Sequence, residues 1–114
     1  MAEHDWIEEF QGAVTVTDEN RIILEMNERA VKNFQDDGGR ALLGTDVQEC
    51  HPEPAKTKLK EIMAGRRTNV YTIEKGGVKK LIFQAPWTRG GRYQGMVELS
   101  LEIPFDMPHF VRKG

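Results

Sequence analysis

Cysteine is almost absent from this chain of 114 residues, and long apolar runs are missing altogether. The single cysteine, Cys50, leaves no partner for an internal disulfide. No apolar run approaches the ~18 residues that a transmembrane helix needs. The N-terminal residues MAEHDWIEEF are acidic and lack the basic and apolar regions of a secretory signal. We therefore expect a cytoplasmic protein that does not associate with membranes.

The net charge is also small, −2 from 16 basic and 18 acidic residues, so the chain as a whole has no electrostatic drive toward nucleic acid. Its length suits one domain with one core. Basic residues collect locally at Lys56, Lys58, Lys60, Arg66 and Arg67. We interpret them as the solvated face of a helix, with a docking surface for an acidic partner as the alternative.

The periodicity of apolar residues predicts a lead-in helix over residues 1–11, one domain over 12–103 and a surface tail over 104–114. Strands are expected at 12–18 and 21–26, joined by the turn at 18–20. Asn27 is the predicted N-cap of a short helix, and a longer helix is expected at 54–64. Three more strands follow at 68–75, 78–88 and 93–103, separated by the glycine pairs 76–77 and 90–91.

This order predicts an α+β fold, a five-stranded antiparallel sheet with short helices packed on one face. The last strand alternates cleanly, with Val97 and Leu99 on one side and Met96 and Glu98 on the wetter one. Pro86 has no N–H to donate, so we expect strand pairing to be interrupted there.

Cys50 and His51 stand side by side before the longer helix. Adjacent residues of an extended segment point to opposite sides, which argues against a nucleophile paired with its base. A structural role is the interpretation we favour, because a free cysteine usually behaves as a small buried apolar residue. The sequence has no CxxC, HxxxH or HExxH spacing, so no metal site is expected. His51 and His109 remain weak candidates for a haem ligand.

Three segments together resemble the PAS family of sensory and interaction domains, over about residues 10–103. AVTVTDENRIILEMNERAVKNF resembles the PAS opening, in which Asp18, Ile22, Asn27, Ala30 and Phe34 hold the places of the family pattern. LLGTDVQECHPEP is similar to the PAS segment that ends in His-Pro, and in YQGMVELSLEI, which looks like the closing strand, Gly95 opens the alternation.

The resemblance implies a concave sheet around a small pocket, and a domain that commonly dimerises. The sequence nevertheless departs from two cofactor-bearing types of the family. Cys50 does not stand in the Asn-Cys-Arg context of flavin photosensors, and the helix at 54–64 lacks the histidine of classical haem sensors. No cofactor is therefore strongly implied. Because no output domain follows the last strand, we expect signalling through a separate partner or through an oligomer.

The predicted function is a non-enzymatic sensor or interaction domain, binding a small apolar or aromatic ligand between sheet and helices. The candidates to line that space are Val14, Leu24, Phe34, Leu59, Met63, Phe83 and Leu99. Trp6 and Phe10, ahead of the sheet, are candidates for a homodimer interface. The alternatives are a purely structural dimerisation module whose core is filled, a haem sensor, or an enzyme that uses Cys50.

Overall fold

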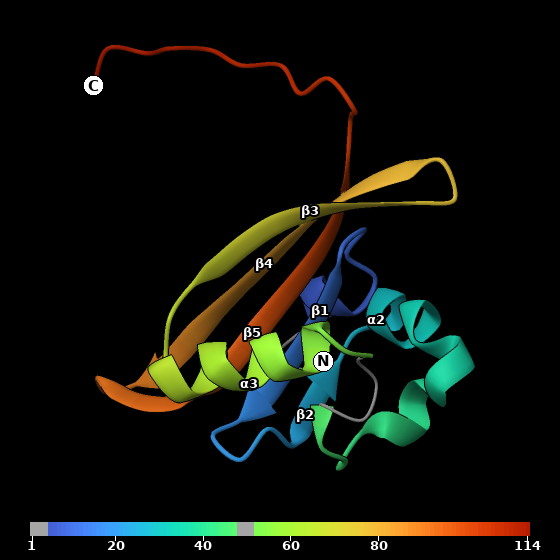
Figure 1. Cartoon of the computed structure of the whole chain (residues 1–114), viewed down its shortest axis with the longest axis vertical. Coiled ribbons are helices and arrows are strands. Elements are labelled where there is room, and N and C mark those ends of the chain that lie inside the picture. The colour runs from blue at the N-terminus through green and yellow to red at the C-terminus, as the bar shows by residue number, and fades with distance from the viewer. Residues whose placement is uncertain (1–4, 48–51) are drawn as a thin grey trace.

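The computed structural model describes residues 5–47 and 52–114, which form one antiparallel sheet of five strands with helices against it (Figure 1). The strands are β1 (Ala13–Asp18), β2 (Ile23–Met26), β3 (Asn69–Lys75), β4 (Val78–Arg89) and β5 (Arg92–Ile103). Their order across the sheet is β2-β1-β5-β4-β3, so the first and last strands pair in its interior. The predicted α+β fold with a five-stranded antiparallel sheet is confirmed.

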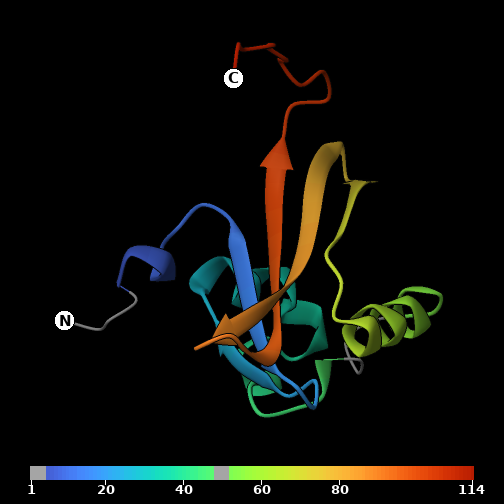
Figure 2. The same ribbon diagram turned by 90° about the vertical axis from the view of Figure 1, so that its left-hand side faces the viewer.

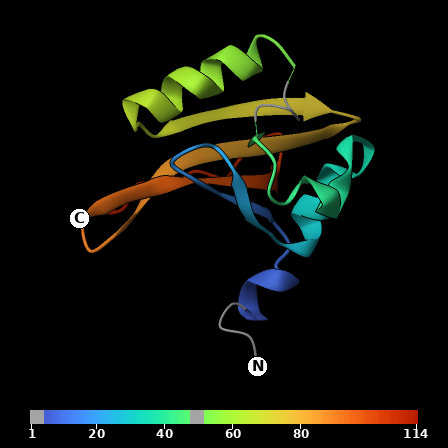
Figure 3. The same cartoon turned by 90° about the horizontal axis from the view of Figure 1, so that it is seen from below.

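The described helical segments lie on both sides of this sheet. They are α1 (Asp5–Glu8), α2 (Glu28–Asn33), η1 (Gln35–Asp37), η2 (Gly39–Leu42) and α3 (Ala55–Gly65). α2 and α3 cover one face, called here the inner face, whereas α1 lies on the opposite, outer face (Figures 2 and 3). No helix in the described ranges is long and apolar enough to cross a bilayer.

Short-range hydrogen bonds make the turns where the sequence predicts them. The Asp18 carboxylate accepts from the backbone N–H of Asn20 at 2.8 Å and of Ile22 at 3.0 Å, which closes the β1–β2 turn. The glycine pairs 76–77 and 90–91 all have positive φ and join β3 to β4 and β4 to β5. These local bonds fix the hairpins, so the helical middle of the chain is left to connect β2 with β3.

Asn27 is a buried junction as well as the N-cap of α2. Its Oδ1 accepts from the backbone N–H of Ala30 and of Val14, each at 3.0 Å. Its Nδ2 donates to the carbonyls of Ile7 at 2.9 Å and Gly12 at 2.8 Å. One side chain therefore ties the lead-in segment, β1 and α2 together, and the predicted cap is confirmed.

The core lies where α2, η2 and α3 meet the inner face. It consists of Ala13, Ile23, Met26, Ala30, Leu42, Val47, Leu59, Ile62, Met63 and Met96, with Val31 and Phe34 packed against it. α3 contributes Leu59, Ile62 and Met63, the stripe that its apolar spacing predicts.

The expected break at Pro86 is wrong. β4 runs continuously from Val78 to Arg89, Pro86 is opposite Met96, and the register shifts only after Trp87. β3 begins at Asn69, opposite Gln84, so β4 has a neighbour on one side only where Pro86 stands. Proline is tolerated on such an edge, since no ladder bond is lost on the open side.

Candidate ligand-binding site

A row of polar side chains crosses the inner face of the sheet. The register places Asn69 of β3 opposite Gln84 of β4, Gln84 opposite Glu98 of β5, and Glu98 opposite Thr15 of β1. Residues that are directly opposite in a sheet share a face. The inner face is therefore polar along this row, although α3 covers part of it.

The row is joined by hydrogen bonds with a fixed direction. Asn69 Nδ2 donates to Gln84 Oε1 at 3.1 Å, and Gln84 Nε2 donates to Glu98 Oε1 at 2.7 Å. An ionised carboxylate only accepts, so Gln84 must turn its NH₂ toward Glu98 and its carbonyl toward Asn69. Gln84 is 2% exposed, and these two bonds satisfy both ends of its amide.

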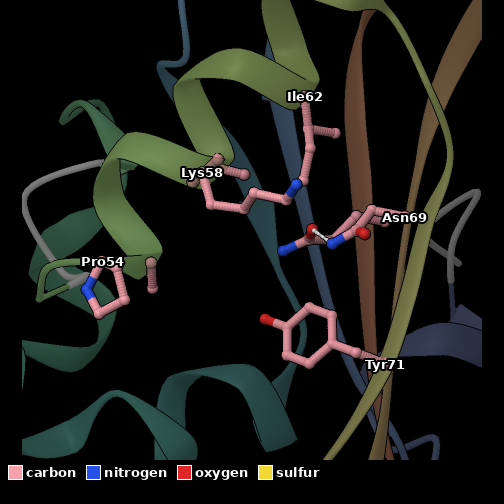
Figure 4. A pocket seen from close by; sticks show the side chains of 8 residues that line it. Pro54, Lys58, Ile62, Asn69 and Tyr71 are labelled. Atoms are coloured by element: carbon pink, nitrogen blue, oxygen red, sulfur yellow. Dashed lines mark hydrogen bonds between the residues drawn. The ribbon is translucent and has the colours of Figure 1, made fainter.

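A pocket of about 430 Å³ lies between α3 and this end of the sheet (Figure 4). The described residues that line it are Pro54, Ala55, Lys58, Leu59 and Ile62 at the helix, and Asn69, Tyr71 and Gln84 on the strands. The helix wall is apolar apart from Lys58, and the strand wall carries two amides and a phenol. An apolar space with a few convergent polar groups is typical of a small-molecule site.

Tyr71 separates this pocket from a second cleft of about 210 Å³ between α2 and β3, which it also lines together with Phe34 and Glu98. Figure 4 shows the Tyr71 side chain pointing from β3 into the space below α3. Burial raises the pKa of the Tyr71 phenol, and the negative charge of Glu98 raises it further. The phenol therefore stays protonated at neutral pH and is able to donate a hydrogen bond.

The two ends of α3 are held by side chains outside the pocket. At its start, Glu53 accepts from the backbone N–H and the hydroxyl of Thr57, each at 2.8 Å, and these bonds hold the pKa of Glu53 below its ordinary value. At its end, the Arg66 guanidinium lies 4.4 Å from the centre of the Tyr93 ring on β5. The Glu53 bonds therefore stabilise the first turn of α3 locally, whereas the Arg66 contact ties the end of the helix to β5, and residues 55–62 form one wall of the pocket.

The structure brings together only some of the residues predicted to line the ligand space. Leu59 lines the pocket, Met63 is buried in the core beside it, and Phe34 lines the second cleft. Leu24 is 46% exposed on the edge strand β2 and lines neither the pocket nor the cleft.

The expectation for Val14, Phe83 and Leu99 needs correction. Phe83 is opposite Leu99 and Leu99 is opposite Val14, so the three form a row of their own. Strand residues alternate between faces, and the adjacent row that contains Gln84 and Glu98 faces the helices. The three apolar residues therefore lie on the outer face. Alternation identified which residues share a face but not which face the helices cover.

The polar residues Lys58, Asn69, Tyr71, Gln84 and Glu98 were missed as site residues. The signal was present, because Glu98 belongs to the wetter side of the last strand. That side was expected to face solvent, whereas α2 and α3 cover it.

Of the haem-ligand candidates, His109 is exposed in the tail that follows β5, and it lines neither the pocket nor the cleft. His51 and the neighbouring Cys50 lie outside the described residues. Within residues 5–47 and 52–114, no three histidine, cysteine or acidic side chains gather in a way that could hold a metal ion.

No protein-family model matches the sequence, and no curated protein matches it. Several solved structures do match this chain. The PAS domain of BvgS from Bordetella pertussis is 17% identical with a TM-score of 0.63, and the match covers 87% of this chain and 82% of that one. This chain has the PAS fold.

Two further structures share this PAS fold. A sensory box sensor histidine kinase from Vibrio cholerae is 13% identical with a TM-score of 0.67, covering 90% of this chain and 89% of that one. The Aer2 receptor from Vibrio cholerae, described as a dual PAS-heme oxygen sensor, is 16% identical with a TM-score of 0.63, covering 82% and 95%. At these identities the likeness is one of fold.

Proposed function

We propose that this PAS domain is a sensory module that binds a small organic molecule in the pocket between α3 and β3–β4. The observation that carries the proposal is the space itself, about 430 Å³ with apolar helix residues facing amide and phenol groups. That volume falls within the roughly 300–1,000 Å³ usual for small-molecule pockets. The solved structures with this fold include a sensor histidine kinase and an oxygen sensor, which supports a sensory role.

The proposed mechanism is a shift in population between two positions of α3. The helix contacts the core through one stripe, and its end is tied to Tyr93 of β5 through Arg66. A ligand that fits only when α3 stands in one position stabilises that position by its differential affinity. The change then reaches β5 and is passed to a separate partner protein or to a second copy of the chain.

We further propose that a second copy packs on the outer face. Val14, Phe83 and Leu99 make this face apolar, and a hollow of about 220 Å³ beside α1 is lined by Trp6 and Val14 among others. Trp6 is 70% exposed and contacts Phe10 edge to face at 6.5 Å between ring centres. A large aromatic pair left on the surface is characteristic of an interface.

The proposed role is binding rather than catalysis. The pocket residues supply hydrogen bonds and apolar contact, and the described residues that line it include no cysteine, serine or histidine that could act as a nucleophile or base. The alternative of a structural dimerisation module with a filled core is weaker, since the space between α3 and the strands is open.

The test is native mass spectrometry of the freshly purified chain, together with its absorption spectrum. We expect an extra bound mass that is lost on denaturation. In Ala55→Trp the indole fills the pocket from its helix wall, so the extra mass should disappear. The matched control is Ala64→Trp, at an exposed position of α3 that does not line the pocket.

A bound mass that survives Ala55→Trp would place the ligand elsewhere. A chain that carries no extra mass, and whose melting temperature no compound of a metabolite library raises, would favour the structural dimerisation module instead. Absorption in the visible region would indicate haem or flavin, and would contradict the expectation from the sequence that neither cofactor is bound.

A further inference from the structure

We propose that the pocket selects a small apolar molecule that carries a carboxylate. This inference rests on the proposed function and adds the chemical class of the ligand. It follows from the charge of the pocket lining, from the direction of the hydrogen bonds on its strand wall, and from the position of Lys58.

Lys58 is the one residue charged at neutral pH among the described residues that line the pocket. Figure 4 shows its side chain extending from α3 across the space toward the side that carries Asn69. None of the described lining residues is acidic, so the space has a positive charge on one wall and no negative charge of its own. An anionic group on a ligand complements that charge.

The direction of the hydrogen bonds leaves N–H donors on the strand wall, beside the carbonyl oxygen of Asn69, which this chain of bonds does not occupy. Each amide NH₂ carries two hydrogens, and the chain of bonds toward Glu98 uses only one from Asn69 and one from Gln84. The same chain occupies the Gln84 carbonyl. Each amide therefore keeps a second N–H, and the Tyr71 hydroxyl, protonated at neutral pH, adds a further donor.

Glu98 is the nearest acidic group in this row, and Gln84 stands between it and the pocket. Glu98 lines the second cleft and a small space under α3 instead. The Gln84 amide, which donates to this carboxylate at 2.7 Å, stands between Glu98 and an anion in the pocket, whereas Lys58 lines the pocket itself.

The remaining wall defines the body of the ligand. Pro54, Ala55, Leu59 and Ile62 present an apolar surface opposite the donors. A ring system placed against these residues directs a carboxylate on a short arm toward Lys58 and Tyr71. The ligand class is therefore an aromatic or branched aliphatic carboxylic acid.

Three probes with one ring test this assignment: indole-3-acetate, which is anionic, indole-3-acetamide, which is neutral, and tryptamine, which is cationic. Each is titrated into the isotopically labelled chain, and binding is followed by NMR at Lys58, Asn69, Tyr71 and Gln84. We expect indole-3-acetate to bind about tenfold more tightly than the amide, with tryptamine weakest. Raising the salt concentration should weaken the acid only, because charge attraction is screened.

Lys58→Met should lower the affinity for indole-3-acetate about tenfold, as expected for the loss of a charge-assisted hydrogen bond, and leave the amide unchanged. Lys60→Met is the matched control, since Lys60 is exposed on the same helix and does not line the pocket. Tyr71→Phe should weaken both the acid and the amide by about threefold, because the hydroxyl donates to an acceptor that both possess.

The outcomes separate this inference from the proposed function. If the acid and the amide bind equally at the pocket residues, or if tryptamine binds most tightly, the anionic class is wrong and the pocket stands. If the acid loses the same affinity in Lys60→Met as in Lys58→Met, the role of Lys58 is wrong. If none of the probes perturbs the pocket residues at millimolar concentration, the ligand class is wrong, and the proposed site is then decided by the bound mass and its loss in Ala55→Trp.

Discussion

Gly95, at which the backbone of β5 lies close against that of β1, provides the sharpest test of the fold. Its φ of +156° is one that residues with a Cβ rarely adopt. A Cβ built there would overlap the carbonyl oxygen of Thr17 and lie 2.7 Å from the carbonyl carbon of Asp18. Both obstacles are backbone atoms, so no side chain can rotate away to make room, and the two strands would have to separate locally.

The expected cost of Gly95→Ala combines two effects. Backbone strain at such a position costs about 1–3 kcal/mol. Separation of the strands also endangers the bond from Trp87 Nε1 to the Thr17 carbonyl, 2.9 Å long, which contributes about 1 kcal/mol. We therefore expect the free energy of unfolding to fall by about 2–4 kcal/mol, and the melting temperature by roughly 8–16 °C.

The assay is urea denaturation followed by tryptophan fluorescence and circular dichroism. Gly91→Ala is the matched control, since Gly91 also has positive φ, +79°, but nothing lies within 4 Å of its added Cβ. That variant carries the backbone cost alone, about 1 kcal/mol. If Gly95→Ala were no more destabilising than Gly91→Ala, the close approach of β5 to β1 would be refuted.

Three further predictions follow from single side chains. Asn27→Ala should lower the free energy of unfolding by about 3 kcal/mol in urea denaturation, because four hydrogen bonds of a buried amide are lost. Asn27→Asp keeps the two accepted bonds but turns a buried carboxylate oxygen toward the Ile7 and Gly12 carbonyls, so it should also be destabilising. In a Tyr93→Phe background, ultraviolet titration should show the Tyr71 pKa above its ordinary value of 10.0, and Glu98→Gln should lower it. Because the pKa of Tyr71 is higher in the folded chain, the unfolded chain deprotonates first. The stability due to Tyr71 is therefore complete below about pH 10 and is lost as pH rises through the folded pKa. A Tyr71 pKa that does not change in Glu98→Gln would contradict the electrostatic interaction between Glu98 and Tyr71. Trp6→Ala should weaken self-association at least tenfold in analytical ultracentrifugation, and a variant that dimerises as tightly as the parent chain would exclude the α1 side of the outer face.

The elements of this chain were predictable because their signals are local. Asp18 makes its turn with residues two and four positions ahead, and Asn27 caps a helix that begins at the next residue. The glycine pairs close hairpins between adjacent strands. Each of these features depends on neighbours in the sequence, so the pattern of residue types is sufficient to place it.

The site was not predictable in the same way. Asn69, Gln84 and Glu98 come from three strands and meet through hydrogen bonds that join residues 14 and 15 positions apart. Their polarity suggested a solvated face, as does the alternation of any two-sided strand. The pocket depends further on where α3 stands above that face, which its own apolar stripe does not specify.

The strands, their turns, the helix cap and the sets of residues that share a face follow from local sequence patterns, because period and turn chemistry act over a few residues. Which set the helices cover depends on long-range packing, and α2 and α3 cover the polar set rather than the apolar one. A polar group that is buried under a helix needs a hydrogen-bond partner, and the Asn69–Gln84–Glu98 bonds supply such partners only once the three strands are aligned.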